Sequence, residues 1–548
     1  MVLSSYGIRG RIVTMTAEDA VIKDGTVYIV DTNIAAIVKA GDPVPATCTD
    51  LPVINSGCTI FPGMIELHNH LSYNCLPLWN VPKKFGNRGQ WGRVDAYQEL
   101  ISGPMKLLGK TPGYVEAIVR YVECKCLMAG VTTSQGIMLF SNAGIRKYYR
   151  GIVRNVEDGM SEQLPNVDAH IPDIASKDAA HFLTQLNKST CLLLHLAEGA
   201  DESARTHFES LRIDKKNWAI TSALTGIHCG GLMTKDYTVM KKLGASMVWS
   251  PLSNLLLYGA TAKIKAAKQK GIKIGLGSDW SPSGSKNLLG ELKAAKVFSD
   301  NSGKIFTDYE LICMATKNAA EIIHWEERLG TLENGKLADL FLVDGIEGNP
   351  YNQLLHTTES DINMVVIDGT PRLGTATLMK IFGKGSENRK LGKQSRVLNL
   401  KQETQNSIVG KLKLSQAEKK LKGALKNLND IARQTPPLQS VGFGNDRILM
   451  PATAIQKTNE PTWVLVLDHD EEEGEPMRPH LPGDNEPTMT ISTGVAGASL
   501  PKEFPVIELD PLTVTDDKKY FTKLTAAINL PAYMKSNLPK FYQSAHQD

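Results

Sequence analysis

The chain has 548 residues, too many for one ordinary domain, and its 42% hydrophobic and 22% charged residues are typical of a soluble globular protein. Its formal net charge of +3 is nearly balanced, which gives no indication of a nucleic-acid partner or of a membrane-binding patch. No apolar run reaches the ~18 residues that a membrane span needs.

The cysteines point to a reducing compartment. All eight are scattered along the chain and none forms a Cys-x-x-Cys pair, so a disulfide framework is not expected. Residues 1–15 also lack the apolar segment of a signal peptide. We therefore expect a cytoplasmic protein.

Both flanks of the central region have a β pattern. Residues 1–58 contain short β-rich runs at 10–15, 25–30 and 33–38, and the pattern returns at 329–332, 338–343 and 364–369. The first segment is too short to bury a core alone. We expect residues 1–58 and 326–400 to combine into one small β-sandwich domain.

Between residues 59 and 325, strands and helices alternate. The expected strands are 59–67, 130–135, 150–154, 166–170, 190–195, 219–228, 245–249 and 272–279. The clearest helices are 113–128, 176–186 with Ser176 as N-cap, and 261–270. Several strands are apolar on both faces, as buried parallel strands are. About eight strand–helix units of this size predict a (β/α)8 TIM-like barrel over residues 59–325.

Residues 401–548 form a C-terminal extension whose role the sequence does not indicate. A helix is expected near 415–431 at the end of a basic stretch, residues 380–426, which is either a solvated helix face or a docking site for an acidic partner. Residues 460–501 resemble a long loop with an acidic run at 468–475, a weak Ca²⁺ candidate. Residues 520–542 look helical, interrupted by Pro531 and Pro539.

Two histidines end the first barrel strand. Alternate side chains of a strand share a face, so His68 and His70 point the same way with Asn69 opposite. Neutral imidazole suits zinc and similar ions. A His-x-His pattern alone is weak evidence in a chain with 12 histidines.

Other strand ends strengthen the case for a metal site. The fifth, sixth and eighth strands end in His195, His228 and Asp279. A closed barrel brings all strand ends to one rim, where such a set can hold a Zn²⁺-like ion with one position open for water. The ion would lower the pKa of that water towards ~7. Glu198 is the best candidate for the proton carrier, although a surface glutamate at a helix start is the alternative.

These motifs, in this order, resemble the amidohydrolase superfamily and its mononuclear deaminase and chlorohydrolase branch. The resemblance covers residues 59–345. It is carried by PGMIELHNH at 62–70, GVTT at 130–133, HLAE at 195–198, IHC at 227–229, SPLSN at 250–254, GSD at 277–279 and LGTLENGKLADL at 329–340.

The resemblance implies a role for each site residue. One divalent metal ion, most often zinc and sometimes iron, would be held by a ligand set consisting of His68, His70, His195 and Asp279. Asp279 would also take a proton from the attacking water, His228 would orient that water, and Glu198 would carry a proton to the substrate nitrogen. The expected fourth strand, residues 166–170, lacks the bridging lysine of two-metal branches, which favours one metal.

The implied activity is hydrolysis of a C–N bond in a small molecule, by deamination or by opening of a cyclic amide. Ser253, Asn254 and Trp280 are candidate substrate contacts. The loop DWSPSG at 279–284 differs from the run common in nucleobase deaminases, so the substrate stays open. The alternative is a catalytically silent scaffold or partner-binding protein. The family also suggests a homodimer.

Overall fold

The computed structural model describes most of the chain. The described residues are 4–92, 94–159, 161–383, 385, 387–402, 408–436, 438–443, 446–451, 462–467, 489–491 and 500–542. The acidic run at 468–475 lies outside them. No helix among the described residues is both long enough and apolar enough to cross a lipid bilayer.

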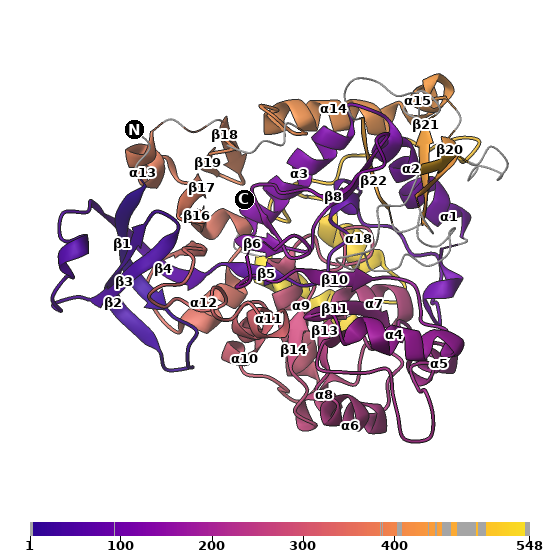
Figure 1. The fold of residues 1–548 in the computed structure, drawn as a ribbon. Coiled ribbons are helices and arrows are strands. Elements are labelled where there is room, and N and C mark those ends of the chain that lie inside the picture. The colour runs from indigo at the N-terminus through magenta and orange to yellow at the C-terminus, as the bar shows by residue number, and fades with distance from the viewer. Residues whose placement is uncertain are drawn as a thin grey trace.

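Segments from both flanks form one nine-stranded sheet at one end of the molecule (Figure 1). In spatial order the strands are β18 (Glu387–Leu391), β19 (Gln394–Leu398), β17 (Thr370–Gly374), β16 (Ile362–Ile367), β15 (Leu340–Asp344), β4 (Val53–Pro62), β1 (Ser5–Val13), β2 (Val21–Val30) and β3 (Asn33–Lys39). The antiparallel ladder between β4 and β15, with Ile60 opposite Leu342, joins the two flanks as expected. A single sheet accounts for these strands, and the expected two-layered sandwich is not evident.

The expected first barrel strand is in fact two strands. Residues 59–62 belong to β4 of the nine-stranded sheet, and β5 (Met64–Glu66) starts the parallel strands. Gly63 lies at the junction, where a Cβ atom would come within 2.2 Å of the Thr132 hydroxyl. The missing side chain therefore allows the two strands to follow each other at this close approach.

Eight parallel strands carry the site. They form a three-stranded sheet of β5, β6 (Val131–Ser134) and β9 (Arg154–Asn155), and a five-stranded sheet of β10 (Val167–His170), β11 (Cys191–Leu196), β12 (Leu224–His228), β13 (Ser246–Trp249) and β14 (Ile274–Leu276). Among the described residues, isolated contacts link the two, including Val167 N to Val156 O at 3.1 Å and a bridge between Asn69 and Asp279. The strands of the expected barrel are thus present, but no continuous ladder among the described residues closes them into a ring.

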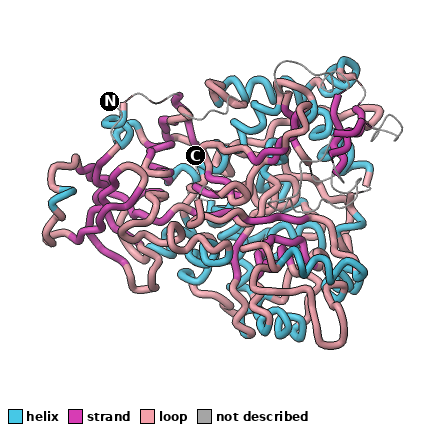
Figure 2. Tube along the Cα trace, viewed as in Figure 1, coloured by secondary structure: helices cyan, strands magenta, loops and turns pink. Residues whose placement is uncertain are grey.

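Helices lie between and around these strands (Figure 2). They are α1 (Asp95–Tyr97), α2 (Gly103–Lys110), α3 (Val115–Met128), α4 (Ala179–Leu186), α5 (Glu202–Glu209), α6 (Thr234–Lys242), α7 (Pro251–Tyr258), α8 (Ile264–Gln269), α9 (Leu288–Asn301), α10 (Asp308–Met314), α11 (Lys317–Ile322), α12 (Pro350–His356) and α13 (Ala376–Met379). Shorter helical turns are η1 (Ala46–Cys48), η2 (Leu71–Cys75), η3 (Arg88–Gln90), η4 (Gln98–Ser102), η5 (Ser176–Asp178), η6 (Glu359–Asp361) and η7 (Lys380–Phe382).

Two local expectations were wrong. Residues 329–332 form no strand, because the Leu329 amide bonds back to the carbonyl of Trp325 in a turn. Ser176 does not cap a helix, since it begins the short turn η5, and α4 starts only after Asp178.

The C-terminal extension packs on the parallel-strand region and is drawn in orange to yellow (Figure 1). Its elements are α14 (Leu414–Lys426), α15 (Leu428–Gln434), β20 (Leu438–Phe443), β21 (Asp446–Pro451), β22 (Trp463–Leu465), β23 (Met489–Ile491), α18 (Tyr520–Ala526), α19 (Ala532–Asn537) and η8 (Leu538–Tyr542). The strand β22 pairs with β7 (Met138–Ser141), which also pairs with β8 (Arg146–Tyr148). The helices expected near 415–431 and in 520–542 are confirmed.

Candidate active site

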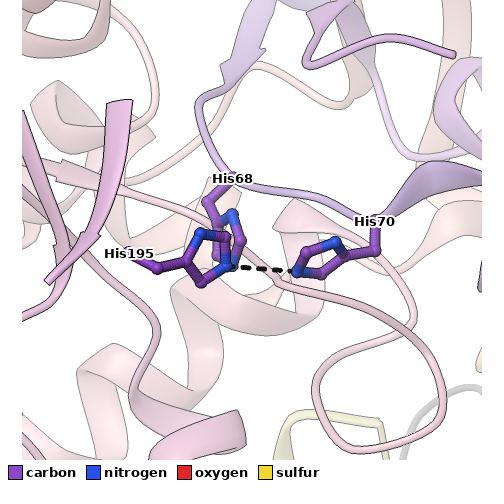
Figure 3. A group of neighbouring side chains, drawn as sticks. All are labelled: His68, His70 and His195. Carbon is purple, nitrogen blue, oxygen red and sulfur yellow. Dashed lines mark hydrogen bonds between the residues drawn. The ribbon is translucent and has the colours of Figure 1, made fainter. Parts of the chain in front are cut away.

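Five side chains meet where the parallel strands end. His68 and His70 follow β5, His195 lies in β11, His228 ends β12, and Asp279 follows β14. The Nε2 atoms of His70 and His195 are 3.3 Å apart, and three of the imidazoles are seen facing one another in Figure 3. The Nε2 atoms of His68 and His70 lie 3.3 and 3.4 Å from Oδ1 of Asp279. The convergence expected from the strand-end pattern is therefore present.

The backbone holds two of these residues in a strained conformation. His228 and Asp279 have φ angles of +64° and +66°, in the left-handed region that side-chain-bearing residues rarely adopt. Such conformations cost about 1–3 kcal/mol each and persist where the surroundings impose them. Here the Asp279 amide donates to His68 O at 2.9 Å, and the His70 amide donates to Asp279 O at 2.7 Å. These bonds fix the His-x-His segment against the end of the eighth parallel strand.

Burial favours the neutral form of the imidazoles of His68, His195 and His228. It lowers the pKa of His228 to about 3, although the Asp279 carboxylate acts in the opposite direction. Burial likewise lowers the pKa of His68, and it lowers that of His195 well below the usual value. For Asp279, burial raises the pKa but the facing histidines outweigh it, so the carboxyl pKa is below its ordinary value. Neutral imidazoles beside a carboxylate are the protonation states in which these groups bind metal.

The donor atoms fit a divalent metal ion. The nitrogens of His68, His70 and His195 lie within 4.8 Å of one another, and so do the donor atoms of His68, His228 and Asp279. Among the described residues, the buried Nε2 of His68 has no partner in good hydrogen-bonding geometry, and its polar neighbour Asp279 Oδ1 lies 3.3 Å away. Buried polar atoms are normally paired. An ion bound among these donor atoms would be coordinated by His68 Nε2 as well. The residues present therefore fit the divalent metal ion that this set of donor atoms implies.

Glu198 faces the same space from the segment after β11. Its Oε2 is 3.8 Å from His228 Nε2 and 3.9 Å from Arg88 Nε, while its Oε1 accepts a hydrogen bond of 2.7 Å from the Tyr258 hydroxyl. Burial raises the pKa of Glu198 to about 7, and Arg88 acts in the opposite direction. A carboxyl group with such a pKa can both give and take a proton near neutral pH.

Comparison with known proteins decides the family. Residues 59–372 match the model described as the amidohydrolase family, which is more than half of the chain. The chain belongs to the amidohydrolase family. The resemblance inferred from the motifs is thereby confirmed, and the protein is a hydrolase of the amidohydrolase type.

Curated proteins and solved structures are also similar to this chain. A 5-methylthioadenosine/S-adenosylhomocysteine deaminase from Thermoanaerobacter pseudethanolicus is 24% identical over 398 residues, 65% of this chain and 91% of that protein. Among solved structures, E. coli guanine deaminase has a TM-score of 0.52 at 16% identity and covers 67% of this chain and 99% of its own. A triazine hydrolase from Arthobacter aurescens has a TM-score of 0.52 at 18% identity, with 67% and 94% covered. The structural matches establish the fold and leave the substrate open.

Two of the candidate substrate contacts lie next to residues of the amidohydrolase site and do not line its cavity. Ser253 and Asn254, both in α7, are fully buried and lie outside the cavity wall. The Ser253 hydroxyl donates to Asp279 Oδ2 at 2.5 Å, and the Asn254 amide nitrogen is 3.3 Å from His228 Nδ1. Their side chains therefore orient Asp279 and His228, whereas Trp280, the third candidate, does line the cavity.

The cavity of this amidohydrolase is small, with a volume of about 20 Å³, and it has a partly aromatic wall. Its lining includes His70, Arg88, Trp91, Tyr97, Ile171, His195, Glu198, His228, Asp279 and Trp280. Arg88 and Tyr97, which form part of this wall, were not assigned to the site from the sequence. The only signal was the aromatic and basic composition of the loop after the first strand. Lys177, the nearest lysine to the fourth parallel strand, is exposed on η5 and takes no part in the wall.

We predict that Tyr258→Phe lowers kcat about 10- to 100-fold and leaves KM nearly unchanged, because a hydrogen bond to a charged group contributes roughly 1.5–3 kcal/mol. Tyr258 is itself held, since Trp91 Nε1 donates to its hydroxyl at 3.0 Å. Steady-state kinetics measures the effect. Tyr28→Phe, in the nine-stranded sheet, is the matched control. Equal rates in both variants would contradict a positioning role for Tyr258.

Proposed function

We propose that the protein is a metal-dependent deaminase that removes an amino group from a small heterocyclic substrate by hydrolysis. The observation that carries the proposal is the arrangement of Glu198 and His228 on one wall of the same small cavity that presents His70, His195 and Asp279. A proton carrier thus faces a candidate metal centre across one shared cavity.

We infer that His68, His70, His195 and Asp279 hold one divalent ion, with zinc as the first choice for nitrogen and carboxylate ligands. The ion would supply a water nucleophile active at neutral pH. Asp279 would accept a proton from the attacking water on a carboxylate oxygen, while Ser253 holds the other oxygen. His228, neutral and supported by Asn254, would orient the attacking water.

Glu198 would then deliver a proton to the leaving nitrogen. Its position between the Tyr258 hydroxyl and the cavity keeps one oxygen fixed and the other directed at His228. Release of ammonia requires that the leaving nitrogen be protonated. The geometry supports this role for Glu198 more than that of a surface carboxylate, because the side chain is buried in the cavity wall.

The aromatic wall supports a planar substrate. The ring of Trp280 lies 5.4 Å from that of His70 and 5.9 Å from that of Trp91, so a flat ring entering the cavity would meet aromatic faces. The named relative that deaminates 5-methylthioadenosine and S-adenosylhomocysteine favours amino-purine nucleosides over cyclic amides. We therefore propose deamination of an amino-substituted purine as the reaction.

Ammonia release by the zinc-loaded full chain tests this proposal. The probes are 5-methylthioadenosine, S-adenosylhomocysteine, guanine and a cyclic amide such as hydantoin. We expect turnover of one or more amino-purines and none of the cyclic amide. Ring opening of the cyclic amide without ammonia release from any amino-purine would show that the reaction class is wrong.

We expect about one zinc or iron per chain in the purified protein, and loss of that metal in His195→Ala, because three neutral imidazoles and one carboxylate form one four-ligand set. Elemental analysis of both proteins measures the content. His207→Ala, on α5, is the matched control, since its imidazole bonds to Asp173 outside the ligand set. Two metals per chain would indicate a binuclear site. An absence of metal after loading would favour the silent scaffold.

A further inference from the structure

A carboxylate of the C-terminal extension is buried among the loops of the site. Asp510 is 0% exposed, and all of its polar groups are paired. Its Oδ2 accepts a hydrogen bond of 2.7 Å from Lys125 Nζ, and its Oδ1 accepts one from Lys286. Its amide donates to Cys75 O at 3.0 Å, and its carbonyl accepts from the Tyr121 hydroxyl. Residues far apart in the chain therefore converge on one side chain.

The contacts of Lys125 continue towards the cavity. Its ammonium also donates to Ser281 Oγ at 2.9 Å and to Asn74 O at 2.7 Å. The Asn74 side chain accepts from the Ser281 amide at 2.7 Å and donates to Asn69 Oδ1 at 2.9 Å. Asn69 is the residue between the two histidines of the first motif. A continuous series of hydrogen bonds therefore connects Asp510 to Ser281, two residues after Asp279, and to Asn69, between His68 and His70.

The loop of residues 280–286 is held at two points. Ser281 fixes its start through Lys125, and Lys286 fixes its end through Asp510 and Asp517, the latter at 2.9 Å. Trp280, whose ring lines the cavity, opens this loop. Loss of one partner in such a buried ion cluster leaves an uncompensated charge and forces the loop to rearrange.

We propose that Asp510 is a positioning residue of the substrate pocket, which fixes the loop of residues 280–286 through Lys125 and Lys286 and thereby sets where Trp280 meets a planar substrate. The inference rests on the proposed function and extends it to the C-terminal extension, which lies outside the residues that match the family model. The competing explanation is a stabilising ion cluster with no influence on substrate binding.

The first readout is hydrogen exchange, which needs no substrate. In metal-loaded Asp510→Asn we expect the amides of residues 280–286 to exchange at least about 10-fold faster than in the wild type, because their local opening becomes easier. The amides of β1 to β3, at the far end of the molecule, should be unchanged. Glu508→Gln is the matched control, since its ion pair with Lys519 is exposed.

The second readout separates positioning from stability. With 5-methylthioadenosine as the probe, Asp510→Asn should raise KM at least about 10-fold and change kcat by less than about threefold, because the loss concerns substrate contact rather than proton transfer. Adding Ser281→Ala should raise KM no further, since both changes interrupt the same series of bonds. Metal content should stay at the wild-type value.

A lower melting temperature with unchanged KM, or unchanged exchange in residues 280–286, overturns the proposal. If Asp510→Asn does not accumulate as folded protein, Ser281→Ala alone decides, because it removes the hydrogen bond from Lys125 at the start of the loop, beside Trp280, and leaves Asp510 paired with both lysines. Unchanged KM and exchange in that variant also overturn the proposal. If the wild type turns over no probe, the proposed function fails, and calorimetric binding of 5-methylthioadenosine replaces KM in the same comparison.

Discussion

Asp279→Asn is expected to lower kcat/KM by about 10³-fold or more, because loss of a proton acceptor alone costs about 10²- to 10⁴-fold and a candidate metal ligand is weakened as well. The carboxylate faces the Nε2 atoms of His68 and His70 on one oxygen and accepts the Ser253 hydroxyl on the other. An amide cannot carry the same charge or accept a proton at neutral pH. Steady-state kinetics on metal-loaded protein, together with metal content per chain, measures both effects.

The surface carboxylate Asp300 provides the control. It pairs with Lys296 on α9 and is partly exposed, so Asp300→Asn should leave kinetics and metal content unchanged. Activity of Asp279→Asn within about threefold of wild type would remove Asp279 from the proposed mechanism.

Glu198→Gln is expected to retain the metal and to slow turnover by about 10²-fold or more, as is typical for a lost general acid–base group. Glutamine preserves the size of the side chain and still accepts from the Tyr258 hydroxyl, but it cannot deliver a proton to the leaving nitrogen. The test compares kcat and metal content in wild type and variant.

The control for this change is Glu202→Gln on α5, four residues further along the chain, whose side chain is largely exposed. Loss of metal in Glu198→Gln would identify Glu198 as a ligand or a structural residue instead. An unchanged kcat with metal retained would require another proton carrier in the cavity.

The candidate site could be predicted from the sequence to the extent that its residues follow general rules of β-strand geometry. His68 and His70 alternate along the chain, and His195 and His228 end apolar runs typical of buried parallel strands. Because parallel strands place their ends at one edge, residues separated by more than a hundred positions could be proposed for one centre, and the family resemblance then implied a role for each. The structure brings them together as expected.

Contacts that depend on packing between distant segments could not be predicted in this way. Lys125 and Asp510 are 385 positions apart, and nothing in the local sequence of either marks the pair. Tyr258 lies on an apolar helix whose spacing indicates burial and not a hydrogen bond to Glu198. The substrate-facing wall and its supports therefore emerge only from the assembled fold.

Strand pairing was the other feature of the fold that could not be predicted from the sequence. A β pattern shows that a segment is extended but not which strand lies beside it, so the change of sheet at Gly63 went unseen. For the same reason the sequence could not show whether the flanking strands make one sheet or two. It also could not show whether the parallel strands close into a ring.

The order of the nine-stranded sheet has a consequence for biosynthesis. The ladder between β4 and β15 pairs strands that leave the ribosome at very different times. At translation rates of about 5–20 residues per second, the edge of β4 would wait roughly 15–55 s for its partner. An unpaired apolar strand edge is a site of aggregation. Nascent chains that end before β15 should therefore depend on chaperones far more than the completed protein does.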